Sequence, residues 1–263
     1  MVLKNLLDRL TEQINVPEFI KDDPVSFPRR FSSREDIEIV SLLVSHISWG
    51  KREMILRDAG RMLALMDDNP FQFVREGDFS AIDPEKNIHR TFFGRDLLYF
   101  LRGLRRIYSD FGSLENFASK IGVAGAEFPS WKLAEGINAV MDESNCGGFQ
   151  SIRCLPRDLG STALKRLNMA LRWLVRDDGI VDMGVWKVIK PSQLYIPLDV
   201  HVGNIGRKLG LISRKANDRK TVVELTSRLA EFDPTDPVKY DFALFGAGIE
   251  GIGISEAQPL YIK

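Results

Sequence analysis

The sequence contains little cysteine and histidine, the residues that form disulfides in small folds and bind many metal ions. Only two of the 263 residues are cysteine and only three are histidine. Cys146 and Cys154 cannot form a disulfide framework or a four-ligand metal set, and the widely spaced histidines do not complete one. We therefore expect a protein with no metal and no cofactor.

Long apolar runs are also missing. No stretch approaches the ~20 apolar residues that a helix needs to cross a bilayer. The first residues, MVLKNLLDRLTEQI, mix charged with apolar side chains and lack the apolar core of a signal peptide. These absences predict a cytoplasmic protein with no membrane partner.

The sequence also carries no net charge, since 36 basic residues balance 36 acidic ones. A net charge of zero does not favour a protein that binds nucleic acid over its whole surface. The charge is unevenly distributed, however, because residues 153–176 hold six basic residues and one acid, and residues 201–220 hold the same numbers again. These segments could be ordinary solvated helix faces, or they could form a positive surface around the region between them.

Alternation with period two and glycine-rich phosphate loops are absent, whereas apolar residues recur at three- and four-residue steps through most of the chain. This periodicity predicts an all-α fold of about ten helices. Residues 33–48 are apolar nearly all round and should form a central, buried helix. A glycine-rich, irregular tail is expected from residue 246. Helix caps are expected at Ser33, Ser113, Ser130, Asp199, Asn217 or Asp218, and Asp236.

The segment 161–211 concentrates residues that suit chemistry. Four leucines define the buried face of its first helix, expected over 161–175, and these are Leu164, Leu167, Leu171 and Leu174. A polar stripe runs beside that face and consists of Lys165, Asn168, Arg172 and Arg176. Lys165 begins the stripe and would lie at the edge of a cleft, unless the stripe is simply a solvated basic face.

The second part of this segment contains PLDVHV and opens another helix. Asp199 falls at the N-cap, where its carboxylate accepts backbone N–H bonds and stays ionised. A rigid carboxylate could serve only as a cap, or it could also stabilise a cation. We predict that Lys165 and Asp199 face each other across a cleft.

The run YIPLDVHVGNIGRKLGL resembles a segment of the helix-hairpin-helix DNA glycosylases of base-excision repair. The resemblance implies that Asp199 is catalytic and that Lys165, one helix earlier, is the nucleophile of the glycosylase/lyase members. Residues 39–50 resemble the superfamily's early buried helix, whose end lines the base pocket. The interval of 34 residues from Lys165 to Asp199 is closer to that of the archaeal 8-oxoguanine glycosylases. The whole chain also resembles a bacterial family of about this length with no assigned function.

Two features of the superfamily are missing from this sequence. Residues 155–163, LPRDLGSTA, lack the paired glycines of the hairpin signature, and the four-cysteine iron–sulfur signature is absent. An atypical hairpin is shared with the archaeal 8-oxoguanine glycosylases.

The resemblance implies a two-lobed helical fold with a cleft between the lobes. Residues 33–178 would form the central lobe, residues 1–32 with 181–263 would form the other, and the cleft would lie beside Asp199. The partner would be double-stranded DNA, from which the protein would remove a damaged purine, such as an oxidised one, with lyase activity. Lys165 would attack the sugar C1′, and Asp199 would accept its proton or stabilise the developing positive charge.

Other side chains would bind the flipped nucleotide or the DNA backbone. The expected nucleotide-binding residues are His46, Trp49, Asn168, Arg172, Trp173, Asp182, Trp186 and His201. The expected nucleic-acid-binding residues are Arg166, Arg207, Lys208, Arg214 and Lys215, and the last four would neutralise phosphates near the second helix. A tryptophan in a helical protein is more often part of the core, and Asp182 could position Lys165 or cap a short turn.

Two other interpretations remain open. The chain could be a non-catalytic, nucleic-acid-binding helical protein of the same fold, which the zero net charge and the altered hairpin favour. It could also be a helical protein-interaction module. The sequence does not indicate the oligomeric state.

Overall fold

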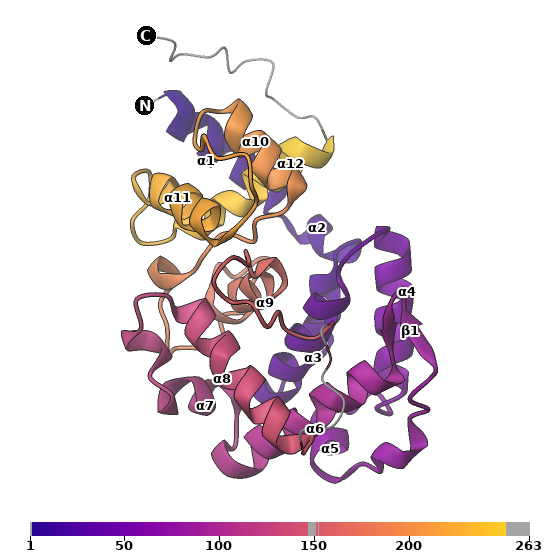
Figure 1. Cartoon of the computed structure of the whole chain (residues 1–263). Helices are drawn as coiled ribbons and strands as arrows, with labels where there is room; N and C mark the ends of the chain where they lie inside the picture. Colours follow the sequence, from indigo (N-terminus) through magenta and orange to yellow (C-terminus); the bar gives the residue numbers. More distant parts are fainter. Residues whose placement is uncertain (1, 147–150, 152, 251–263) are drawn as a thin grey trace.

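The computed structural model describes residues 2–146, 151 and 153–250, and over this part of the chain the fold is almost entirely helical (Figure 1). The prediction of an all-α protein is confirmed, with one small exception. The exception is an antiparallel hairpin of two strands, β1 (Asn87–His89) and β2 (Phe92–Phe93), which are too short to show alternation in the sequence. The α-helices of the described chain are α1 (Val2–Ile14), α2 (Pro17–Lys21), α3 (Arg34–Ile47), α4 (Arg52–Ala64), α5 (Pro70–Glu76), α6 (Gly94–Phe111), α7 (Leu114–Lys120), α8 (Pro129–Ser144), α9 (Lys165–Val175), α10 (Val200–Lys208), α11 (Arg219–Ala230) and α12 (Asp241–Glu250).

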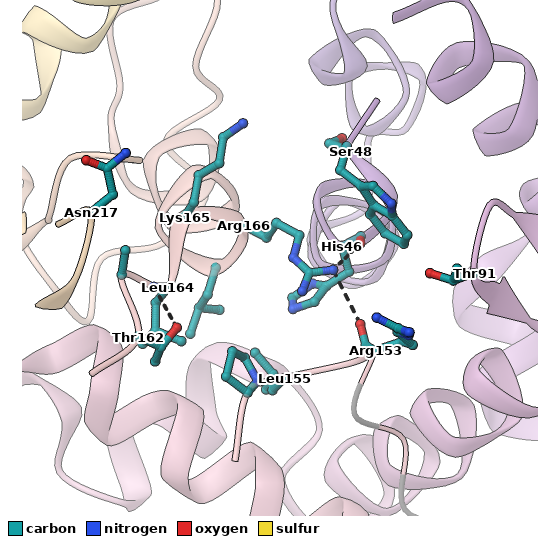
Figure 2. A pocket seen from close by; sticks show the side chains of 14 residues that line it. His46, Ser48, Thr91, Arg153, Leu155, Thr162, Leu164, Lys165, Arg166 and Asn217 are labelled. Atoms are coloured by element: carbon teal, nitrogen blue, oxygen red, sulfur yellow. Dashed lines mark hydrogen bonds between the residues drawn. The ribbon is translucent and has the colours of Figure 1, made fainter. Parts of the chain in front are cut away.

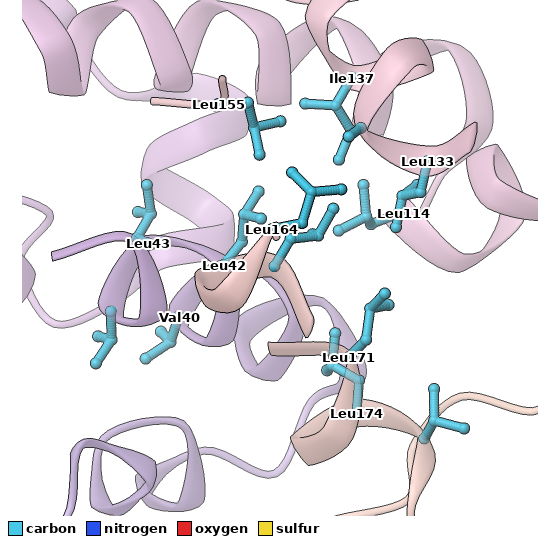
Figure 3. Packing of buried hydrophobic residues seen from close by; sticks show 14 of the residues in the cluster. Val40, Leu42, Leu43, Leu114, Leu133, Ile137, Leu155, Leu164, Leu171 and Leu174 are labelled. Atoms are coloured by element: carbon cyan, nitrogen blue, oxygen red, sulfur yellow. The ribbon is translucent and has the colours of Figure 1, made fainter. Parts of the chain in front are cut away.

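Helix α3 lies in the centre of the structure, as its composition predicts. All of residues 37–47 are buried, because the helix is apolar nearly all round and is covered by neighbours on every side. Helix α9 packs directly on α3. The leucines of α9 and of the turn before it interdigitate with those of α3, α7 and α8 (Figure 3).

The two ends of the described chain lie together. Helix α1 packs against α12, and α12 packs against α10, so the first helix joins the last ones at one end of the molecule (Figure 1). Helices α3 to α8 occupy the other end, and α9 lies between the two groups (Figure 1). The helices on the two sides of α9 therefore come from different parts of the sequence.

Four of the expected helix caps are present. The side chains of Ser33, Ser113, Asp199 and Asp218 each accept a hydrogen bond from a backbone N–H in the first turn of α3, α7, α10 and α11. Asp218, rather than Asn217, is therefore the cap of α11.

Helix α9 begins later than predicted, at Lys165 instead of residue 161. Leu164 has a left-handed backbone conformation, with φ +48°, which ends the preceding turn and prevents the helix from starting earlier. The Leu164 side chain is buried in the core, and this burial offsets the strain of the left-handed conformation. Lys165 is consequently the first helical residue.

Two other predicted caps were wrong. Helix α8 begins at Pro129 with Phe128 at the N-cap, because proline favours the first helical position, so Ser130 lies inside the helix. Asp236 and the proline that follows it start a short 3-10 helix (Pro237–Tyr240), and α12 begins only at Asp241.

The prediction of an irregular tail from residue 246 was wrong for residues 246–250. Helix α12 continues through Gly246 and Gly248, and a Cβ atom at Gly246 would lie 2.6 Å from the side chain of Ile14. The glycines therefore allow the close approach of neighbouring elements rather than breaking the helix. Residues 251–263 of the expected tail lie outside the described residues.

Candidate functional site

Lys165 and Asp199 meet in the structure. The Lys165 Nζ lies 3.1 Å from Asp199 Oδ2, and the two side chains are 34% and 17% exposed. The pair is therefore partly shielded from solvent but still open to a ligand.

Helix ends fix both members of the pair. Lys165 is the first residue of α9, directly after the buried, left-handed Leu164. Asp199 is the N-cap of α10, where its Oδ1 accepts a 2.9 Å hydrogen bond from the Val202 N–H. One carboxylate oxygen thus caps the helix while the other contacts the lysine. The cap holds the carboxylate rigidly in front of the ammonium group.

A cavity of about 540 Å³ opens beside Lys165 (Figure 2). It is bordered by the end of α3, the start of α9 and the loop before α9. Three of its lining residues are cationic, namely Arg153, Lys165 and Arg166, and no carboxylate is among the lining residues that the structure describes. The remaining lining residues are His46, Ser48, Trp49, Thr91, Leu155, Pro156, Thr162, Ala163, Leu164, Leu167 and Asn217. The wall of this cavity therefore suits an electron-rich ligand.

Arg166 belongs to the cavity wall rather than to an outer surface. Its Nη1 donates to the backbone carbonyl of His46 at 2.8 Å and to that of Arg153 at 3.3 Å. Its guanidinium carbon lies 5.2 Å from the centre of the Trp49 ring, within cation–π range. Burial lowers the pKa of Arg166, although an arginine still remains charged. The prediction that Arg166 binds nucleic acid stays a prediction, and its position would place it at a ligand in the cavity rather than beside α10.

His46 lines the same cavity as a neutral hydrogen-bond acceptor. Its Nδ1 lies 2.6 Å from the carbonyl oxygen of Leu42, and since a carbonyl can only accept, Nδ1 carries the proton. Burial and the nearby Arg166 charge lower the pKa of His46 to about 3. Among the described residues none donates a hydrogen bond to Nε2, whose lone pair is therefore open to a ligand.

Several predicted nucleotide-binding residues lie away from the cavity. Trp173 and Trp186 are core residues at 0% and 1% exposure, and the Trp186 Nε1 donates to Glu38 at 2.7 Å. His201 is exposed on α10 and does not line the cavity. Asn168 is buried, and its Nδ2 donates to the carbonyl of Ala163, so it closes the turn before α9. The predictions for Trp173, Trp186 and Asn168 were wrong, because burial depends on contacts from distant parts of the chain. The predicted role of the exposed His201 stays a prediction.

The polar stripe of α9 is buried as well. Arg172 contacts Asp182 at 3.2 Å and Asp241 at 2.5 Å, while Arg176 contacts Asp182 and also Asp236, at 2.9 Å. Both arginines are 4% exposed. Arg172 and Asp182 thus belong to an internal ion-pair network, and Asp182 neither contacts Lys165 nor caps a turn.

The basic residues around α10 divide into two kinds. Arg207 donates to the backbone carbonyls of Arg214 and Lys215, and Arg214 forms an ion pair with Asp218 at 2.7 Å, so both hold the loop after α10. Lys208 and Lys215 are exposed. The two lysines are the ones that remain open to a phosphate.

Most residues of the cavity wall, Arg153, Thr91 and Asn217 among them, were missed from the sequence as site residues. Arg153, Thr91 and Asn217 come from three different loops that fold to the same place. Asn217 stood out only as a possible helix cap, and it donates instead to the backbone carbonyl of Asp199 at 3.2 Å. Nothing in the local sequence pattern connects these loops.

Comparison with known proteins identifies the family of this chain. No group of three or more histidine, cysteine or acidic residues in the described part of the chain could hold a metal ion, and no helix described there is long and apolar enough to cross a membrane. No curated protein and no solved structure matches the sequence. A family model described as "Protein of unknown function (DUF2400)" matches residues 23–250, and since this is most of the chain, the protein belongs to that family.

Proposed function

We propose that the protein is a DNA glycosylase of base-excision repair, with lyase activity, that removes a damaged purine from double-stranded DNA. The observation that carries this proposal is the contact of 3.1 Å between Lys165 and Asp199, beside a cavity with aromatic and cationic walls. A lysine nucleophile with a fixed carboxylate partner is the arrangement such a reaction needs. The resemblance of the PLDVHV segment to the helix-hairpin-helix glycosylases supports the same function.

The reaction begins with the transfer of a proton from the Lys165 ammonium to Asp199. The neutral amine then attacks C1′ of a flipped-out nucleotide, so that the Nζ–C1′ bond forms while the glycosidic C1′–N bond breaks. The electron pair leaves with the base, which takes up a proton from solvent. The C1′–O4′ bond then breaks, O4′ keeps the electron pair and takes up a proton from Nζ, and a Schiff base remains at C1′. Loss of a C2′ proton then expels the 3′ phosphate with its electron pair.

The cavity would hold the flipped base. Its volume of about 540 Å³ lies within the usual range for a small-ligand site, and the Trp49 ring offers a stacking surface. Arg166 keeps N–H groups that bond no described residue, and the His46 Nε2 offers a lone pair. A base that presents a carbonyl oxygen next to a ring N–H would satisfy both side chains, and oxidised purines have such an edge.

The fold proposed for this function is two-lobed. Residues 33–178 would form one lobe, and residues 1–32 with 181–263 the other, with DNA in the cleft between them. The packing of α1 against α12 agrees with a lobe built from both termini. The exposed Lys208 and Lys215 would contact phosphates on the Asp199 side of the cleft.

Borohydride trapping on duplex DNA with an abasic site tests the nucleophile, because the reagent reduces a Schiff base to a stable protein–DNA adduct. The wild-type protein should form the adduct, and Lys165→Ala should form none. Lys187→Ala is a matched control, since Lys187 is an exposed lysine that also contacts an aspartate, at 3.3 Å. Absence of an adduct with the wild type, or an equal yield with Lys165→Ala, would refute the proposal.

A nucleic-acid-binding protein without catalysis is the second candidate. The loop from residue 153 to 164 favours it, because this segment forms turns and no helix and therefore does not build the usual hairpin. Salt-dependent binding to an abasic duplex without any trapped adduct would identify this alternative.

A further inference from the structure

Trp49 contacts a histidine, His89, whose ion pair with Asp58 lies outside the cavity. His89, on β1, is 0% exposed, and its ring meets the Trp49 ring edge to face with a centre-to-centre distance of 4.8 Å. Its Nε2 lies 2.8 Å from the Trp49 carbonyl oxygen, and its Nδ1 lies 2.8 Å from Asp58 Oδ2. One imidazole therefore touches both the backbone and the side chain of a residue in the cavity wall.

The partners of His89 determine its protonation. A carbonyl oxygen can only accept a hydrogen bond, so Nε2 must carry a proton. Burial alone would raise the pKa of Asp58, but its pKa is lowered, and the hydrogen bond and charge of Arg57 contribute to this independently of His89, so the carboxylate is ionised and also only accepts. Nδ1 must therefore carry a proton too. A neutral ring would leave two lone pairs facing each other at 2.8 Å.

We propose that His89 is a positioning residue that, as an imidazolium paired with Asp58, fixes Trp49 in the wall of the cavity. The proposal explains why the chain forms a hairpin in an otherwise helical fold, since β1 packs against α4 and places His89 between Asp58 and Trp49 (Figure 1). It holds for whatever the cavity binds and does not rest on the proposed reaction.

Other charges near the pair come from α4 and from the turn after β1. Arg57 and Arg61 lie 2.8 and 3.6 Å from Asp58 Oδ1, the oxygen that His89 does not contact. Both arginine side chains are mostly exposed, at 52% and 69%, so solvent screens them. Arg90 follows His89 and turns its guanidinium toward Gly50. Within the described chain Asp58 is therefore the charge in direct contact with the imidazole.

Nitrogen-15 NMR of histidine-labelled protein tests the charge state directly, because the chain has only three histidines. His201→Gln removes the exposed one and leaves His46 and His89 to observe at neutral pH. We expect one neutral ring protonated on Nδ1, from His46, and one imidazolium protonated on both nitrogens. Two neutral rings would overturn the proposal. This test leaves the buried residues unchanged, because it replaces only the exposed His201.

The isosteric variant Asp58→Asn tests the positioning role. Without the carboxylate charge, His89 should become neutral with its proton on Nε2, and the indole N–H signal of Trp49 should shift or broaden. The signals of the other three tryptophans, Trp131, Trp173 and Trp186, should stay in place and show that the fold is intact. An imidazolium that persists in this variant, or an unchanged Trp49 signal next to a neutral His89, would contradict the proposal.

Discussion

The two oxygens of the Asp199 carboxylate have different partners. Oδ1 accepts the Val202 N–H at 2.9 Å and Oδ2 contacts the Lys165 ammonium at 3.1 Å. The structural and the chemical role are therefore separable, because an amide oxygen can replace the first contact but has no charge for the second.

The substitutions Asp199→Asn and Asp199→Ala should separate these roles. Asparagine is as good an N-cap as aspartate, so Asp199→Asn should change the free energy of unfolding by less than about 1 kcal/mol, whereas Asp199→Ala should cost about 1 kcal/mol more. Both should slow adduct formation on abasic DNA by about 10²–10⁴-fold, because a proton acceptor is lost. Urea unfolding and trapping rates measure the two effects. Wild-type trapping by the asparagine variant would exclude a catalytic carboxylate.

Single residues were predictable from the sequence where their environment is local. The cap at Asp199 follows from the residues immediately around it, and its position is correct. The role of a tryptophan does not follow in this way. Trp49 lines the cavity while Trp173 and Trp186 are in the core, because residues far away in the sequence cover the latter two.

At the scale of elements, α3 is held by a buried carboxylate. Glu38 is 0% exposed and accepts four hydrogen bonds. The donors are the Tyr108 hydroxyl, the Leu114 and Glu115 backbone N–H groups and the Trp186 indole N–H. This side chain connects α3 with α6, with the start of α7 and with the connector after α9.

Replacing Glu38 by glutamine should destabilise the protein strongly for so small a change. In either orientation the amide nitrogen would face a backbone N–H, and each buried donor without a partner costs about 1–3 kcal/mol. Chemical denaturation of Glu38→Gln measures this loss. Glu12→Gln, on the exposed side of α1, is the control and should be neutral. Equal stability of both variants would show that the buried bonds contribute nothing.

The start of an element was predictable where a polar side chain determines it. Ser33 and Ser113 cap their helices as expected. The start of α9 was not predictable, because Leu164 has a conformation that leucine disfavours and is held there by tertiary packing. That boundary sets the position of Lys165, so the site depends on a feature that local pattern does not encode.

At the scale of the whole molecule, ion pairs connect α9 with the chain that follows it. Arg172 was expected to bind the flipped nucleotide, and Arg176 continues the same polar stripe. Acidic residues from the loop after α9 and from the region of α12 nevertheless bury both arginines. The acids are distant in the sequence, so the helix pattern alone could not distinguish a solvated stripe from an internal network. The network also brings Asp241 near the Lys165–Asp199 pair. The Asp199 charge raises the pKa of Asp241, and the Lys165 charge lowers it.

Asp241 should make the stability of the protein depend on pH. Burial, with a contribution from the Asp199 charge, raises the pKa of Asp241 from 3.8 to about 6 in the folded state. The folded protein then binds more protons than the unfolded chain between these values. The contribution of this group is therefore fully present below pH 3.8 and is lost as the pH rises through about 6. Two pKa units correspond to about 3 kcal/mol.

Asp241→Asn should remove this dependence, because the amide keeps an acceptor for Arg172 and does not ionise. Relative to the wild type, the variant should gain up to about 3 kcal/mol of unfolding free energy between pH 4 and pH 7. Asp218→Asn is the control, since a hydrogen bond from Arg214 lowers the pKa of Asp218 from 3.8 to about 2. The stabilisation from Asp218 is lost as the pH falls from about 3.8 to about 2, so the difference between this variant and the wild type should stay constant between pH 4 and pH 7. Urea unfolding at a series of pH values measures both. A constant difference between Asp241→Asn and the wild type over this range would show that Asp241 is ionised in the folded protein throughout.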